Sequence, residues 1–175
     1  MKKGGGKAKG SAFERDVAKI LTKWSSGQNK EYWFWRSPSS GAVSTINEGN
    51  GEISGDIIAI KPEGTFLTSK FSIEVKVGYP TSNFHKHLKK VKNDEIRSFW
   101  YQCVYDASRA EKLPMLIYKK KQYNALIGIS VINEKLNGIS SITMTWDDHE
   151  DLPSCHFYDF EEFLTVITPE DIKNL

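Results

Sequence analysis

Two short apolar stretches decide the fold of this chain, namely Asp56-Ile57-Ile58-Ala59-Ile60 and Phe71-Ser72-Ile73-Glu74-Val75-Lys76-Val77. Both are rich in β-branched residues, and the turn-like stretch Lys61-Pro62-Glu63-Gly64 follows the first. The pattern predicts two neighbouring strands. If they pair as a hairpin, Asp56 comes within ligand distance of Glu74.

The second of these strands is expected to carry its charges on one face. Because side chains alternate along a strand, Glu74 and Lys76 share a face, while Ile73, Val75 and Val77 point the other way. A carboxylate and an ammonium then lie side by side. By itself, such a pair is typical of a surface ion pair.

The order and spacing of the charged residues favour a second interpretation. Hydrolysis of a phosphodiester uses a divalent cation, and carboxylate oxygens hold such a cation. Only 17 residues separate Asp56 from Glu74, and the carbonyl of Val75 could supply a further oxygen. Lys76 could stabilise developing negative charge or orient the attacking water.

The rest of the chain predicts helices on both sides of these strands. Apolar periodicity indicates an amphipathic helix from Ser11 to about residue 25, where Ser11 and Glu14 fit a capping box. The resulting order of helix, strands, helix and strand predicts an α/β fold, a central mixed β-sheet flanked by helices. The other expected elements are strands at 32–36, 113–118, 124–132 and 141–146, a helix at 93–111 and a short helix near 159–164.

Charge is distributed unevenly along the chain. Residues 147–175 hold nine acidic residues against Lys173 alone, so residues 1–146 have 23 Lys and Arg against 13 Asp and Glu, a net charge of +10. A body this basic favours a polyanionic partner. We expect residues 1–10, almost entirely Gly and Lys, to form a flexible basic arm, and residues 11–175 to form one domain with an acidic extension at about 147–175.

The composition also excludes several classes of protein. No apolar run approaches the roughly 18 residues of a membrane span, and the basic N-terminus lacks the apolar region of a secretory signal. Cys103 and Cys155 have no metal-ligand neighbours at short spacing, so a zinc site or structural disulfide is not expected. These features predict an intracellular protein without a membrane partner.

The motif Gly55-Asp56 followed by Glu74-Val75-Lys76 resembles that of the PD-(D/E)xK nuclease superfamily. A helix with Phe13-Glu14-Arg15 precedes the motif, and a helix with Gln102 follows it. Within the superfamily, residues 11–119 look most like archaeal Holliday junction resolvases and related phage or restriction nucleases. The chain departs from the pattern at Gly55, where the motif has Pro.

The resemblance implies a restriction-endonuclease-like α-β-β-β-α-β core and a Mg²⁺ site in which Mn²⁺ can substitute. In this comparison Asp56 and Glu74 are the metal ligands and Lys76 is the catalytic lysine. A helix-1 glutamate and a site-facing glutamine often join such sites, which makes Glu14 and Gln102 candidates. Their alternative roles are a helix cap for Glu14 and an exposed helix residue for Gln102.

Candidate DNA contacts lie in two segments. Arg36, Ser39 and Ser40 loosely match a basic-serine segment that assists at the scissile phosphate in resolvases, although a Ser/Pro/Gly cluster is first of all a turn. The polar, basic stretch 78–92 offers Lys86, Lys89 and Lys90.

The expected function is a metal-dependent DNA endonuclease, with branched DNA such as a Holliday junction as the first choice of substrate. Because a resolvase cuts two strands symmetrically, this interpretation implies a homodimer. The alternatives are a restriction-like or recombination nuclease acting on linear duplex, and an inactive nucleic-acid-binding protein of the same fold.

Overall fold

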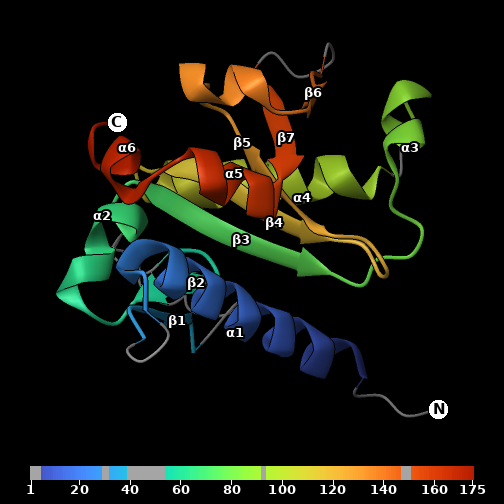
Figure 1. The fold of residues 1–175 in the computed structure, drawn as a ribbon. Helices are drawn as coiled ribbons and strands as arrows, with labels where there is room; N and C mark the ends of the chain where they lie inside the picture. The colour runs from blue at the N-terminus through green and yellow to red at the C-terminus, as the bar shows by residue number, and fades with distance from the viewer. Residues whose placement is uncertain (1–4, 29–31, 39–53, 92–93, 147–150) are drawn as a thin grey trace.

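The structure, a computed structural model, describes residues 5–28, 32–38, 54–91, 94–146 and 151–175 (Figure 1). A long helix leads into two short strands, and a longer strand, a second long helix and four further strands follow. In chain order the elements are α1 Gly5–Ser26, β1 Phe34–Arg36, β2 Ile57–Ala59, η1 Pro62–Gly64, α2 Thr65–Thr68, β3 Phe71–Val77, α3 Phe84–Leu88, α4 Glu95–Arg109, β4 Leu113–Lys119, β5 Ala125–Ile129, η2 Glu134–Gly138, β6 Ser141–Met144, β7 Cys155–Asp159, α5 Phe160–Val166 and α6 Pro169–Lys173.

The main sheet has five strands in the order β3-β4-β5-β7-β6. β3 and β4 are parallel, and the other neighbours are antiparallel. β1 and β2 form a separate antiparallel pair. With α1, β1, β2, β3, α4 and β4 in sequence, the predicted mixed sheet and α-β-β-β-α-β core are confirmed.

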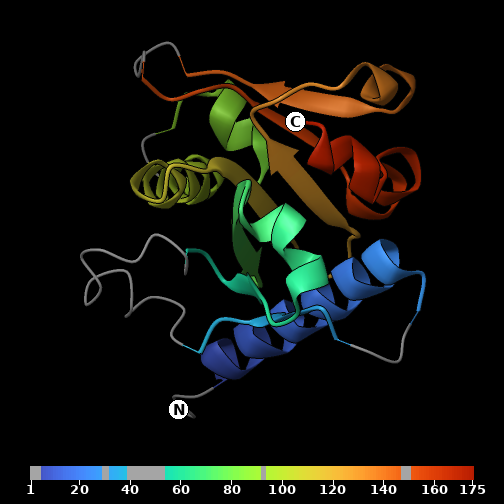
Figure 2. The ribbon, with the colours of Figure 1, turned by 90° about the vertical axis from the view of Figure 1, so that its left-hand side faces the viewer.

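Each face of the sheet has its own apolar core. Ile73 and Val75 of β3 pack with Phe13 and Val17 of α1 on one face, in a cluster that also includes residues of α5. On the other face, Leu116 of β4 packs with the buried side of α4. Figure 2 shows α4 on one side of the strands and α5 and α6 on the other. The alternation read from the sequence therefore assigns the residues of β3 to two different layers.

The first helix begins earlier than predicted. α1 starts at Gly5, so Ser11 lies within the helix and Glu14 is not a capping residue. The structure thus places residues 5–10 in this helix, where the sequence favoured a flexible arm, and residues 1–4 lie outside the described residues. Once the apolar face is anchored on the sheet, each added residue gains a backbone hydrogen bond without a new nucleation cost.

The acidic C-terminal segment is built into the sheet. Residues Cys155–Asp159 form β7, a strand between β5 and β6 that the sequence interpretation missed. The short helix predicted near 159–164 is observed as α5, with Phe160 and Phe163 buried and Glu161 and Glu162 exposed. The described part of the acidic segment, residues 151–175, therefore folds back onto the sheet, with the carboxylates of Glu161 and Glu162 facing outward. Residues 147–150 lie outside the described residues.

None of the helices in the described part of the chain is long and apolar enough to cross a membrane.

Candidate active site

Asp56 lies beside the open edge of β3. A parallel bridge joins Gly55 to Ile73, and the Asp56 N–H donates to the Ile73 carbonyl at 2.7 Å. The Val75 N–H donates to Asp56 Oδ2 at 2.9 Å. Since the N–H and C=O of a strand residue point to the same side, the Val75 carbonyl also faces this edge.

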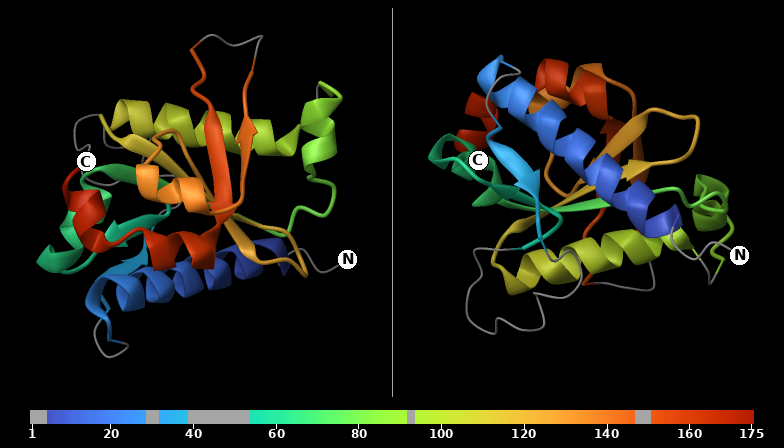
Figure 3. Two further views of the ribbon diagram at one scale, coloured as in Figure 1. Left: turned by 45° about the horizontal axis from the view of Figure 1, so that its top comes forward. Right: turned by 90° about the horizontal axis from the view of Figure 1, so that it is seen from below.

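The two motif strands, which we expected to be neighbours, do not pair as a hairpin. β2 pairs with β1, and η1 and α2 separate β2 from β3. Figure 3 shows β1 and β2 lying beside α1 rather than within the main sheet. The predicted proximity of Asp56 to β3 still holds, because a parallel bridge provides it.

Glycine is required at position 55 because the backbone there passes close to the backbone of Ile73 in β3. The φ of Gly55, +79°, lies in the left-handed region, and a Cβ here would lie 2.5 Å from the Ile73 carbonyl oxygen. Only glycine meets both conditions without strain. This close approach gives a physical reason for Gly55 immediately before the first acidic residue.

Gly55→Ala is expected to push the backbone of Asp56 away from β3. We expect a loss of about 2–4 kcal/mol in the free energy of unfolding, from backbone strain and the disrupted bridge. Urea denaturation measures this loss. Gly78→Ala is the matched control, since Gly78 also has a positive φ, of 86°, but nothing lies within 4 Å of its added Cβ. Equal losses in the two variants would contradict the close-approach argument.

Glu74 and Lys76 lie side by side on the α4 face of β3. Lys76 Nζ forms an ion pair with Glu74 Oε1 and donates to Gln102 Oε1 at 3.1 Å. Lys76 also lies over the ring of Phe99, 5.9 Å from its centroid. Glu74 is buried, with 5% of its surface exposed. The structure thus brings three of the candidate residues together, and α4 supplies the glutamine.

Burial and mutual repulsion shift the acidity of the carboxylates. Burial, followed by the charge of Glu74, raises the pKa of Asp56 to about 7. Burial also raises the pKa of Glu74, although Lys76 opposes the rise. For Lys76, burial alone would lower the pKa, but the charge and hydrogen bond of Glu74 together with the charges of Asp56 and Tyr79 outweigh burial, and the net change is a rise. A positive charge beside these two buried carboxyl groups would favour their ionised forms.

Glu14 reaches the site from α1. It is 7% exposed, and its Oε2 lies 2.8 Å from Nε of Arg36. The negative charge of Glu14 contributes to the raised pKa of Asp56 and of Glu74, so the three carboxylates share one environment.

The candidate DNA contacts lie in β1, in and directly after α3, and in a segment outside the described residues. Arg36 ends β1 and pairs with Glu14, as just described, whereas Ser39 and Ser40 lie outside the described residues. Lys86 lies in α3 and forms an ion pair with Glu95 at 2.6 Å. Lys89 and Lys90 are exposed just after α3.

The sequence interpretation missed Asp106. It lies on α4, four residues after Gln102 and three after Cys103, whose Sγ lies 3.9 Å from the Ser72 carbonyl oxygen. These contacts place the same face of α4 against β3, and the charge of Asp106 raises the pKa of Glu74. Helical spacing from Gln102 was the signal that could have found it.

The donor set fits a hard divalent cation. Carboxylate and carbonyl oxygens are the ligands that Mg²⁺ prefers, and Mg²⁺ commonly keeps several waters with only one or two protein carboxylates. Among the described residues, no three His, Cys, Asp or Glu side chains form a group that could hold a metal ion by themselves. Asp56 and Glu74 would therefore need the Val75 carbonyl, water or substrate oxygens to complete the coordination.

Fold and site together define a nuclease of the PD-(D/E)xK class, a superfamily that generally uses divalent metals. A family model described as phage putative PDDEXK endonuclease matches residues 5–174. The chain belongs to this family, and the match supports a generic endonuclease with DNA as its substrate. It also extends beyond the predicted 11–119 to include β7, α5 and α6. Neither a curated protein nor a solved structure matches the chain.

Proposed function

We propose that the protein is a Mg²⁺-dependent DNA endonuclease that acts on branched DNA, with Mn²⁺ able to substitute. The observation that carries the metal dependence is the pair of buried carboxylates, Asp56 and Glu74, at one sheet edge. Burial and mutual repulsion raise the pKa of Asp56 to about 7. A divalent cation between them would offset this cost.

Asp56, Glu74 and the Val75 carbonyl would hold the cation, which would activate water and offset charge on the scissile phosphate. Asp56 is positioned for this by the Val75 N–H, which holds Oδ2 at 2.9 Å. The backbone thus fixes Asp56 against β3 before any cation binds.

Lys76 is proposed as the group that donates to the phosphate or orients the attacking water. Its ammonium already contacts Glu74 and Gln102, so its position is restrained before substrate binds. Gln102 accepts from Lys76 and thereby orients it. In the reaction, water loses a proton and forms the new bond to phosphorus, while the bond from phosphorus to the 3′ oxygen breaks and that oxygen takes up a proton. The products are a 3′-hydroxyl and a 5′-phosphate if the enzyme follows the superfamily members it resembles.

We favour branched DNA as the substrate because of the resemblance to junction resolvases, and the basic charge of residues 1–146 suits a polyanionic substrate. Symmetric cleavage of a junction requires two active sites, so a homodimer is part of this proposal. The rival proposal of an inactive binding protein is disfavoured by the site itself. Paired carboxylates facing phosphate would weaken binding unless a cation intervenes.

The test compares a four-way junction with a linear duplex of the same arm sequence, each incubated with the full chain and Mg²⁺, Mn²⁺ or EDTA. We expect metal-dependent, paired nicks in the junction and little cleavage of the duplex. Light scattering should report a dimer. Preferential cleavage of the duplex at a defined sequence would instead identify a restriction-like enzyme. Binding of both DNAs with no cleavage in either metal would support the inactive alternative.

A further inference from the structure

Arg36 is tied to the same backbone as Asp56. It is the last residue of β1 and pairs with Ile57 of β2. The next residue, Ser37, is buried, and its N–H donates to the Asp56 carbonyl at 2.7 Å. The Cα of Arg36 is therefore fixed relative to the residue that starts the metal motif.

The side chain of Arg36 connects this backbone to α1. Its Nε donates to Glu14 Oε2 at 2.8 Å, and the side chains are 24% and 10% exposed. A hydrogen bond between charged partners is stronger than a neutral one and is directional. Since Glu14 lies on a different element, this contact links the position of its carboxylate to that of Asp56.

We propose that Arg36 is a positioning residue, which holds the Glu14 carboxylate within the electrostatic environment of Asp56 and Glu74, so that its negative charge helps to hold the cation through bound water. The inference rests on the proposed metal-dependent function. It differs from the sequence-based interpretation of Arg36 as a direct DNA contact. In the structure, the Nε of Arg36 already has a carboxylate partner within the site.

The direction of the change in metal affinity distinguishes a positioning role of Arg36 from the effect of its positive charge alone. If Arg36 were only a neighbouring positive charge, its removal would strengthen cation binding by relieving repulsion. If it positions Glu14, its removal frees the Glu14 side chain from the site and weakens cation binding. Partners that orient metal ligands typically contribute about 10- to 100-fold to metal affinity or activity.

The experiment is a double-mutant cycle on the full chain, with Arg36→Gln, Glu14→Gln and both together. Mn²⁺ affinity is measured by calorimetric titration without DNA, and cleavage of the preferred DNA is measured in parallel. We expect each single variant to lose at least about 10-fold in Mn²⁺ affinity. The double variant should lose no more than Glu14→Gln alone, and Arg36→Lys should recover part of the loss.

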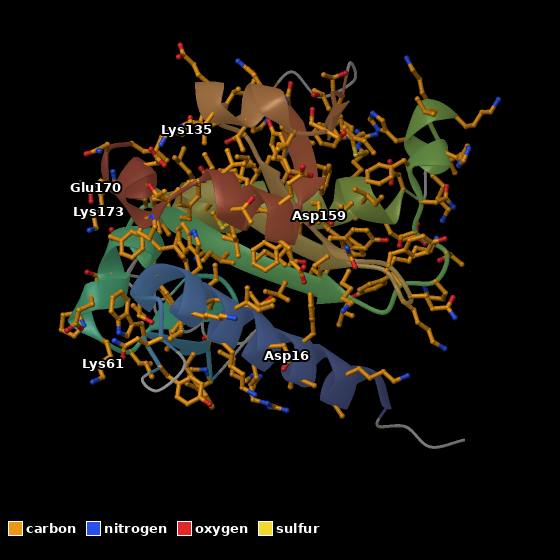
Figure 4. The ribbon with its side chains drawn as sticks, viewed as in Figure 1. Asp16, Lys61, Lys135, Asp159, Glu170 and Lys173 are labelled. Carbon is orange, nitrogen blue, oxygen red and sulfur yellow. The ribbon has the colours of Figure 1, made fainter. Side chains whose placement is uncertain are left out.

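A second ion pair provides the matched control. Lys135 Nζ lies 2.6 Å from Asp171 Oδ1, and Figure 4 places Lys135 beside α6, away from Asp16 on α1. Lys135→Gln and Asp171→Asn should leave Mn²⁺ affinity unchanged. Glu14→Gln and Asp171→Asn keep side-chain size, and the shortened side chains at Arg36 and Lys135 are 24% and 52% exposed, so circular dichroism should report folded proteins.

Three outcomes would overturn the inference. One is tighter Mn²⁺ binding by Arg36→Gln, and another is multiplicative losses in the double variant. The third is unchanged Mn²⁺ affinity with weakened DNA binding, which would assign Arg36 to phosphate. In each of these cases the wild-type chain still binds metal and cleaves DNA, so the proposed function stands. A wild-type chain that binds no Mn²⁺ and cleaves nothing would remove both proposals together.

Discussion

Asp56→Asn and Glu74→Gln are each expected to reduce DNA cleavage by at least about 10³-fold, equivalent to about 4 kcal/mol in the activation free energy. Each change removes a proposed metal ligand while preserving side-chain shape. DNA binding should be retained or improved, because a negative charge facing phosphate is lost with the ligand. Single-turnover cleavage with saturating Mg²⁺ and a gel-shift assay without metal measure the two effects.

The control for this experiment is Asp16→Asn. Asp16 is an exposed carboxylate on α1, labelled in Figure 4, and its loss should leave cleavage within about 2-fold. Lys76→Ala should also abolish cleavage, but Mn²⁺ binding should survive because an ammonium is not a ligand. Near wild-type cleavage by both carboxylate variants would remove the proposed site. Loss of Mn²⁺ binding in Lys76→Ala would contradict the role given to Lys76.

The second large effect concerns stability: the Asp56→Asn substitution that should reduce cleavage should also increase the free energy of unfolding. Asp56→Asn is expected to stabilise the metal-free protein by about 4 kcal/mol at pH 8. Burial, followed by the charge of Glu74, raises the pKa of Asp56 from 3.8 to about 7. The rise corresponds to about 1.4 kcal/mol for each tenfold change in proton affinity. Asparagine removes this cost and can still accept from the Val75 N–H.

The pH dependence follows from the same rise in pKa. Between pH 3.8 and about 7 the folded protein binds more protons at Asp56 than the unfolded chain does, so wild-type stability falls as pH increases through this window. The advantage of Asp56→Asn should therefore shrink to about 2 kcal/mol at pH 5. Urea denaturation in EDTA at the two pH values measures it. A pH-independent difference between the proteins would show that the carboxylate is not the cause.

Local periodicity predicted the orientation of several residues correctly. Alternation in β3 placed Glu74 and Lys76 on one face, where the structure has them in contact. The same rule applies to the strand predicted at 32–36, where Phe34 is buried while Trp35 is 36% exposed. Side-chain direction in a strand or helix depends on backbone geometry alone, so the sequence carries this information without knowledge of the fold.

Elements that depend on distant partners were harder to predict. The sequence of β7 contains Phe157 and Tyr158, which suit a strand, but its place between β5 and β6 is decided by pairing with segments far away in the chain. Likewise, α1 extends to Gly5 through a segment rich in glycine. Intrinsic propensity disfavours glycine in a helix, and here the anchored helix overrides it.

The sequence by itself determined which residue types are available to the site: Asp56, Glu74 and Lys76 in order, with the latter two on one face of a strand. Only the tertiary structure decided how they meet. A parallel bridge at Gly55 rather than a hairpin brings Asp56 to β3, and Arg36 pairs with Glu14 across 22 positions of sequence. Such contacts depend on the packing of whole elements against one another, and local patterns contain no information about which distant elements will pack together.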